Sequence, residues 1–95
     1  MEHFLVRPGE RADDLQLNGL RLIQNPAWFC FGVDAVLLAD YAAQTIKKDS
    51  RVLDLCSGNG IIPLLLSQKS QAAQITGLEI QAPVEEMAER SVRMN

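Results

Sequence analysis

The sequence has 95 residues, of which 47% are hydrophobic, and its formal net charge is −3. This hydrophobic share is enough for a folded core and too high for a disordered chain. The acidic balance does not indicate a nucleic-acid surface, which is usually basic. No apolar run approaches the roughly 20 residues that span a bilayer, and the N-terminus lacks a signal-peptide pattern. We therefore expect a cytoplasmic protein with no membrane part.

The two cysteines and the single histidine form no metal-binding or redox pattern. Cys30 and Cys56 lack the C-x-x-C spacing, and neither has a histidine near it in the sequence. The ordinary interpretation of such isolated thiols is small core residues in a reducing cytosol. His3 lies among charged and turn-forming residues and is expected to be solvated. We therefore expect no metal site.

The N-terminal third of the chain predicts a lead-in followed by a β-hairpin. Residues 1–12 mix charges with a Pro8-Gly9 turn signal, which is typical of an exposed segment. Apolar and polar residues then alternate on both sides of Asn18-Gly19, a strong hairpin signal. We expect one apolar face of this hairpin to lie against the main domain. The leucines on that face are Leu15, Leu17, Leu20 and Leu22.

An aromatic cluster at residues 28–32 leads into a predicted helix over residues 35–46. Most aromatic residues in such a cluster belong to a core, but Phe31 and Gly32 are also candidates for one wall of a ligand pocket. Asp34 is predicted to cap the helix N-terminus by accepting a hydrogen bond from a backbone N–H, and a second role at the pocket mouth stays open. The first turns of the helix are apolar nearly all round, which indicates burial on several sides.

A strand, a glycine-bearing turn and a helix are predicted between residues 51 and 69. The apolar run at residues 52–55 is typical of a strand covered on both faces. Gly58 and Gly60 follow it, where positive φ angles or the close approach of a ligand exclude side chains. Pro63 fits the first turn of the helix, because its missing N–H is no loss there. A turn of this kind directs free N–H groups at a small molecule bound above the sheet.

Two acidic residues narrow the class of that small molecule. Asp54, at the end of the first strand, would repel a diphosphate and suits a ligand with a cationic amino group. The dinucleotide fingerprint G-x-G-x-x-G is also not met, because Pro63 stands where its last glycine would be. A second strand over residues 75–80 brings Glu79, nineteen positions after Gly60, to a place where it can accept hydrogen bonds from ribose hydroxyls.

A last helix is predicted to begin at Pro83 and to cover the sheet. Its stripe of small and apolar residues has helical spacing and consists of Val84, Met87, Ala88, Ser91 and Val92. The pairs Glu86–Arg90 and Glu89–Arg93 are four residues apart and are expected on the solvated face.

From Asp54 to Gly60, and again over residues 77–80, the chain resembles class I S-adenosylmethionine-dependent methyltransferases. The first segment matches their motif I, with Cys56 in place of its first glycine, and the second matches the acidic end of their second strand. The resemblance implies an α/β, Rossmann-like methyltransferase fold, of which this chain holds the first βαβ unit after an N-terminal β-hairpin and helix. The implied residues for S-adenosylmethionine are Asp54, Cys56, Ser57, Gly58, Asn59, Gly60, Glu79 and Ile80, with Phe31, Gly32 and Asp34 as further candidates. The alternative is an α/β domain with a coincidental glycine turn.

The block at residues 31–39, together with residues 20–24 and the aromatic cluster, resembles the bacterial tRNA (adenine-N6)-methyltransferase family from about Arg11 to Asn95. The resemblance implies methyl transfer to adenine N6 of tRNA. That family holds the target amine with an Asn-Pro-Pro-Tyr motif, which is absent from this sequence, so no catalytic residue is assigned in it. Methylation of a protein glutamine or of rRNA, and a truncated non-catalytic binding module, remain open.

Only two parallel strands can be predicted, fewer than a doubly wound sheet contains. Residues 1–33 are therefore interpreted as lead-in and hairpin, and residues 34–95 as the N-terminal part of an S-adenosylmethionine-binding domain. We expect the 95 residues alone to transfer no methyl group. Self-association through unpaired sheet edges is also expected.

Overall fold

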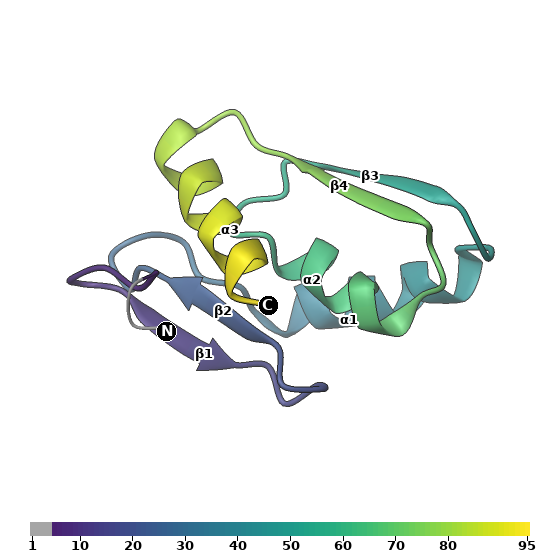
Figure 1. Ribbon diagram of the computed structural model, residues 1–95, viewed down its shortest axis with the longest axis horizontal. Coiled ribbons are helices and arrows are strands. Elements are labelled where there is room, and N and C mark those ends of the chain that lie inside the picture. The colour runs from purple at the N-terminus through teal and green to yellow at the C-terminus, as the bar shows by residue number, and fades with distance from the viewer. Residues whose placement is uncertain (1–4) are drawn as a thin grey trace.

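The computed structural model describes residues 5–95, in which four strands and three helices follow one another (Figure 1). They are β1 (Arg11–Asp14), β2 (Arg21–Gln24), α1 (Val33–Thr45), β3 (Arg51–Leu55), α2 (Ile61–Lys69), β4 (Gln74–Leu78) and α3 (Ala82–Met94). Strands β1 and β2 form an antiparallel sheet, and β3 and β4 form a separate parallel sheet. The predicted α/β class is confirmed. His3 lies outside the described residues.

The predicted hairpin is confirmed, with shorter strands than the leucine pattern suggested. Asn18 and Gly19 both have positive φ, 51° and 77°, and the N–H of Leu20 donates to the carbonyl of Leu17 at 3.0 Å. These are the features of the type I′ turn that matches strand twist. The expected lead-in over residues 1–12 is wrong at its C-terminal end, because β1 begins at Arg11 and pairs with Gln24.

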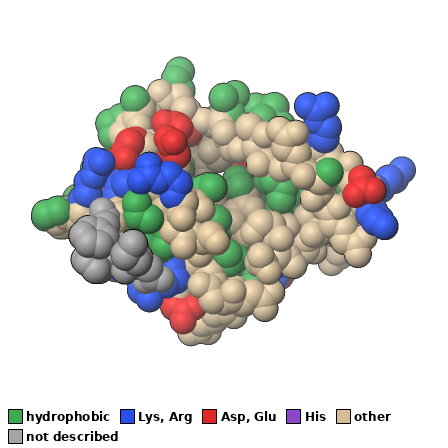
Figure 2. Space-filling model, in the orientation of Figure 1, with side chains coloured by type: hydrophobic (Ala, Val, Ile, Leu, Met, Phe, Trp, Pro, Cys, Tyr) green, Lys and Arg blue, Asp and Glu red, His purple; other side chains and the backbone are tan. Residues whose placement is uncertain are grey.

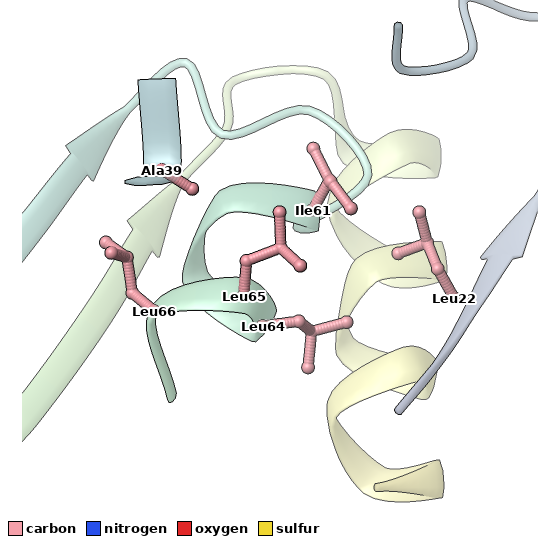
Figure 3. Close-up of a cluster of buried hydrophobic side chains, with 6 residues drawn as sticks. All are labelled: Leu22, Ala39, Ile61, Leu64, Leu65 and Leu66. Carbon is pink, nitrogen blue, oxygen red and sulfur yellow. The ribbon is translucent and has the colours of Figure 1, made fainter. Parts of the chain in front are cut away.

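The core is centred on α2, which packs against α1 and against β4 of the parallel sheet. Six buried side chains from β2, α1 and α2 form one cluster (Figure 3): Leu22, Ala39, Ile61, Leu64, Leu65 and Leu66. The hairpin leucines Leu15 and Leu17 pack against this cluster and are partly buried, and Leu20 is buried. The expectation that the apolar hairpin face lies against the rest of the protein is confirmed.

Helix α1 differs from its prediction at its start and in its burial. It begins at Val33 with Gly32 at the N-cap position, so Asp34 lies inside the first turn and does not cap the helix as expected. Of its residues only Ala39 is buried, whereas Leu37 and Tyr41 are exposed. The reason is that α1 packs against α2 on one side, and no other described element covers its opposite side.

The β3–β4 sheet is covered on one face only, which contradicts the two-sided burial expected from its apolar run. Val52 and Ile75 pack against the α2 cluster, whereas Leu53, Leu55 and Leu78 are exposed, Leu55 to 64%. Hydrophobic side chains are visible on the surface along the upper edge of the molecule in Figure 2. An apolar run therefore indicated a strand correctly, but it did not reveal whether a second layer is present.

Helix α3 packs against β2 of the hairpin, and not mainly against the parallel sheet as predicted. Met87 and Ser91 of the predicted stripe are buried, but Val92 is exposed. Arg90, expected in solvent, is only 4% exposed. Its guanidinium binds Glu10 at 2.6 Å and Glu86 at 2.9 Å. The N-terminal segment folds over this side of the helix, which helical periodicity cannot show. No helix in the described part of the chain is long and apolar enough to cross a membrane.

Candidate functional site

A cavity of about 970 Å³ lies beside the C-terminal ends of β3 and β4, within the usual size range of small-molecule sites. Its walls come from residues 28–38, the turn after β3, the start of α2 and the start of α3. Nine of the eleven predicted site residues line it: Phe31, Gly32, Asp34, Asp54, Cys56, Ser57, Gly58, Asn59 and Glu79. Gly60 and Ile80 are not among the lining residues, and Ile80 points to solvent with 96% of its surface exposed.

The turn after β3 has a left-handed backbone at three of its five residues. Cys56, Gly58 and Gly60 have φ of 57°, 58° and 89°. The N–H of Ser57 donates to the carbonyl of Leu78 at 3.0 Å, which joins this turn to the end of β4. A positive φ is unusual for a cysteine, and such strain of roughly 1–3 kcal/mol is concentrated at functional sites. Cys56 is exposed in the cavity wall, so its expected burial as a core thiol is wrong.

Gly60 contributes to the shape of the site without lining the cavity. It occupies the N-cap position of α2 in a left-handed conformation. A Cβ atom there would lie 3.4 Å from the Cβ of Ala88 on α3. The missing side chain therefore serves both the turn and the close packing of α3.

The carboxylate of Glu79 connects the end of β4 with the glycine turn. Its Oε1 accepts the N–H of Gly58 at 2.8 Å, and its Oε2 accepts the N–H of Gln81 at 3.0 Å. The bonds from Gln81 and Gly58 hold the pKa of Glu79 below its ordinary value, because they favour the charged form. Each carboxylate oxygen can accept a further bond, so Glu79 can hold the glycine turn and still receive ligand hydroxyls.

Asp54 places a second carboxylate in the cavity wall. Its Oδ2 is buried and has no hydrogen-bond partner among the described residues. Burial raises the pKa of this carboxyl above its ordinary value, because the charged form loses hydration. A buried acceptor without a partner is costly. It can be satisfied by a ligand that brings an ammonium group or a hydroxyl into the cavity.

Sequence reasoning missed much of the apolar lining. The apolar residues concerned are Trp28, Phe29, Ala35, Leu38, Ile61, Ile62, Pro83, Val84 and Met87, and the polar Gln81 was missed as well. Phe29 is 90% exposed although it is large and apolar, and its place in the aromatic cluster was the one local signal that could have identified it. Trp28 belongs to the same aromatic cluster, and the remaining apolar residues of this set sit on helices, where the same periodicity also describes ordinary core packing.

The arrangement suits a nucleoside that carries a cationic group. Asp54 offers a partly desolvated carboxylate, Glu79 offers hydrogen-bond acceptors, and Trp28 and Phe31 supply apolar surface. Two carboxylates in one cavity disfavour a diphosphate. S-adenosylmethionine has an ammonium group, ribose hydroxyls and an adenine, so its chemistry fits these residues.

Comparison with known proteins places this site in context. No protein-family model matches the chain. It is 37% identical over 65 residues, 67% of its length, to the tRNA1(Val) (adenine(37)-N6)-methyltransferase of Mannheimia succiniciproducens. It is 40% identical over 57 residues, 60% of its length, to the protein of the same name from Flavobacterium johnsoniae. The chain spans about a quarter of the length of these curated relatives. Over some two thirds of its residues, this chain resembles the tRNA adenine-N6-methyltransferases.

Proposed function

We propose that the cavity binds S-adenosylmethionine and that the chain belongs to an S-adenosylmethionine-dependent methyltransferase with a Rossmann-like domain. The observation that carries this proposal is Asp54, which lines a cavity of cofactor size and whose buried Oδ2 lacks a hydrogen-bond partner in the described residues. When bound, the cofactor supplies an electrophilic methyl group. The similarity to two adenine-N6-methyltransferases supports the same conclusion.

The residues of the cavity have different roles in this proposal. Asp54 binds the ammonium group, and Glu79 binds the ribose hydroxyls while it holds the glycine turn in place. Gly58 leaves space for the ligand, and its N–H is already bound to Glu79. None of these residues acts as an acid or base in the transfer. Methyl transfer depends mainly on holding donor and acceptor in line, and no catalytic residue is assigned to this chain.

The proposed acceptor is N6 of an adenine in tRNA, as the names of the two relatives state for those proteins. A protein glutamine presents a similar planar amide NH₂ group, so the cofactor cavity does not discriminate between the two acceptors. The full-length enzyme should transfer labelled methyl groups to tRNA. Its affinity for tRNA should fall with salt, log K decreasing by roughly 0.7–0.9 for each phosphate contact. Methylation of a release factor with none of tRNA would contradict this acceptor.

The single tryptophan of the chain offers a direct test of cofactor binding. Trp28 lines the cavity and is 40% exposed, so its emission should change when a ligand enters. We expect saturable titration by S-adenosylhomocysteine and a much weaker response to NADH. Comparable binding of NADH, or no response to S-adenosylhomocysteine in a calorimetric titration, would reject the proposal. Binding without any methyl transfer by the full-length protein would favour a non-catalytic binding module.

A further inference from the structure

Gln24, the last residue of β2, is a buried amide with a partner at each end. Only 3% of its surface is exposed. Its Oε1 accepts the N–H of Phe31 at 3.2 Å and the Nδ2–H of Asn59 at 3.1 Å. Its Nε2 donates to Oδ2 of Asp13 on β1 at 2.5 Å. The orientation of the amide is unambiguous, because a backbone N–H can only donate and an ionised carboxylate can only accept.

The two groups that share the oxygen of Gln24 belong to different walls of the cavity. Phe31 lies in the aromatic segment before α1, and Asn59 lies in the glycine turn after β3. The Oδ1 of Asn59 in turn accepts the N–H of Ile61, the first residue of α2, at 3.2 Å. Gln24 is not itself a lining residue. One buried side chain of the hairpin thus connects two cavity walls that are separate in the sequence.

We propose that Gln24 is a positioning residue, which sets the distance between the aromatic wall and the glycine turn and couples both to the β1–β2 hairpin. The ligand chosen to test this role rests on the proposed function, whereas the hydrogen bonds of Gln24 do not depend on it. Hydrogen bonds are strong in a buried site, and a buried donor without an acceptor is costly. Energetic coupling between two sites acts in both directions. A ligand that contacts both walls therefore also stabilises the pairing of β1 with β2.

The first variant for the test is Gln24→Leu, which leaves the N–H of Phe31 and the amide of Asn59 without their acceptor. In the full chain we expect the Kd for S-adenosylhomocysteine to rise roughly tenfold or more, because two buried donors lose their partner. NMR hydrogen exchange should show faster exchange at the amides of Phe31 and Ile61, by about tenfold relative to the wild type.

A charge-compensated pair separates positioning from general destabilisation. In Gln24→Glu the carboxylate still accepts from Phe31 and Asn59, but its other oxygen faces the carboxylate of Asp13 and is repelled. Adding Asp13→Asn places an amide donor at that point. We expect Gln24→Glu alone to weaken binding and the double variant to restore both the Kd and the protection of the Phe31 amide. Failure of this rescue would contradict the proposed role.

The matched control is Ser91→Ala on α3. The Oγ of Ser91 is buried and accepts the N–H of Ile23 at 2.9 Å, so the variant removes another buried bond of β2 at a point away from the cavity. We expect a lower melting temperature with an unchanged Kd and unchanged relative exchange at Phe31. An equal loss of affinity in Ser91→Ala and Gln24→Leu would overturn the inference.

The two proposals can fail separately. If the wild-type chain does not bind S-adenosylhomocysteine, the proposed function is rejected. The exchange rate of the Phe31 amide then decides the role of Gln24. Faster exchange in Gln24→Leu, with recovery in Asp13→Asn/Gln24→Glu, supports the inference, and wild-type exchange in Gln24→Leu overturns it.

Discussion

Glu79 and Gly58 are 21 positions apart in the sequence, yet the carboxylate of one accepts the N–H of the other at 2.8 Å. The bond ties the end of β4 to the turn that follows β3. Because the same carboxylate also accepts the N–H of Gln81, one side chain holds two loops at the cavity. Glu79 therefore holds the loops of the site in place, in addition to the role in binding ribose that is proposed for it.

Replacing Glu79 by Gln should weaken binding of S-adenosylhomocysteine by roughly tenfold or more, since charge-assisted bonds are about twice as strong as neutral ones. A glutamine amide also has a single acceptor oxygen, so one of the two backbone N–H groups loses its partner. Calorimetric titration measures the change. Glu89→Gln, an exposed position on α3, is the matched control and should bind normally. An unchanged affinity in Glu79→Gln would reject the assignment.

Replacing Asp54 by Asn should weaken ligand binding and stabilise the free protein at neutral pH. Burial raises the pKa of Asp54 from its ordinary value of 3.8, so the native state binds this proton more readily than the unfolded state. The wild type therefore loses stability as pH rises from below 3.8 through the raised pKa. Thermal unfolding of both proteins across this range checks the sign. A less stable Asp54→Asn at neutral pH would contradict it.

Replacing Arg90 by Gln should cost about 3–5 kcal/mol of unfolding free energy, because Glu10 then keeps a buried charge without its partner. The side chains of Arg90 and Glu10 are 5% and 7% exposed. Arg93→Gln lies one turn further along the same helix, on its exposed side, and should change the free energy by about 0.5 kcal/mol or less. Urea denaturation of the two variants measures both free energies of unfolding. Equal losses would show that the buried ion pairs of Arg90 stabilise the protein no more than an exposed arginine does.

Replacing Glu10 by Gln should make the free energy of unfolding depend less on pH in the acidic range. The side-chain bond from Arg90 holds the pKa of Glu10 below its ordinary value of 4.5, against an opposing effect of burial. A lowered pKa adds stability above the unfolded value, and this is lost as pH falls through the folded value. Denaturation at neutral pH and at roughly pH 3 should show a smaller loss in Glu10→Gln than in the wild type. An identical loss of stability in both proteins would show that other carboxyl groups cause the loss at acidic pH.

Replacing Gly77 by Ala should disturb the glycine turn from the neighbouring strand. A Cβ atom at Gly77 would lie 2.8 Å from Oγ and 3.0 Å from Cβ of Ser57, closer than side-chain atoms normally approach. We expect weaker binding of S-adenosylhomocysteine and a lower melting temperature. Adding Ser57→Gly removes these two atoms and leaves the contact with Cγ of Pro63 at 3.4 Å, so it should restore part of the melting temperature. No recovery in the double variant would show that the clash lies elsewhere.

Local features of this protein could be predicted from the sequence because their energies depend on neighbouring residues. Asn18-Gly19 adopts the positive φ angles of a hairpin turn, and Gly58 and Gly60 do the same after β3. Pro63 lies in the first turn of α2. The backbone preferences of glycine, asparagine and proline act within a few residues, so they are readable without knowledge of the fold.

Burial and long-range partners were decided by the tertiary structure alone. Leu55 and Arg90 were assigned to the wrong environments, since a periodic pattern shows which residues share a face but not what covers that face. Arg90 binds Glu10 at a separation of 80 positions, and Gln24 binds Asn59 at a separation of 35. Such contacts depend on how α3, the hairpin and the glycine turn are brought together. The sequence determined the turns and the acidic residues of the site, whereas packing determined which side chains hold its walls in place.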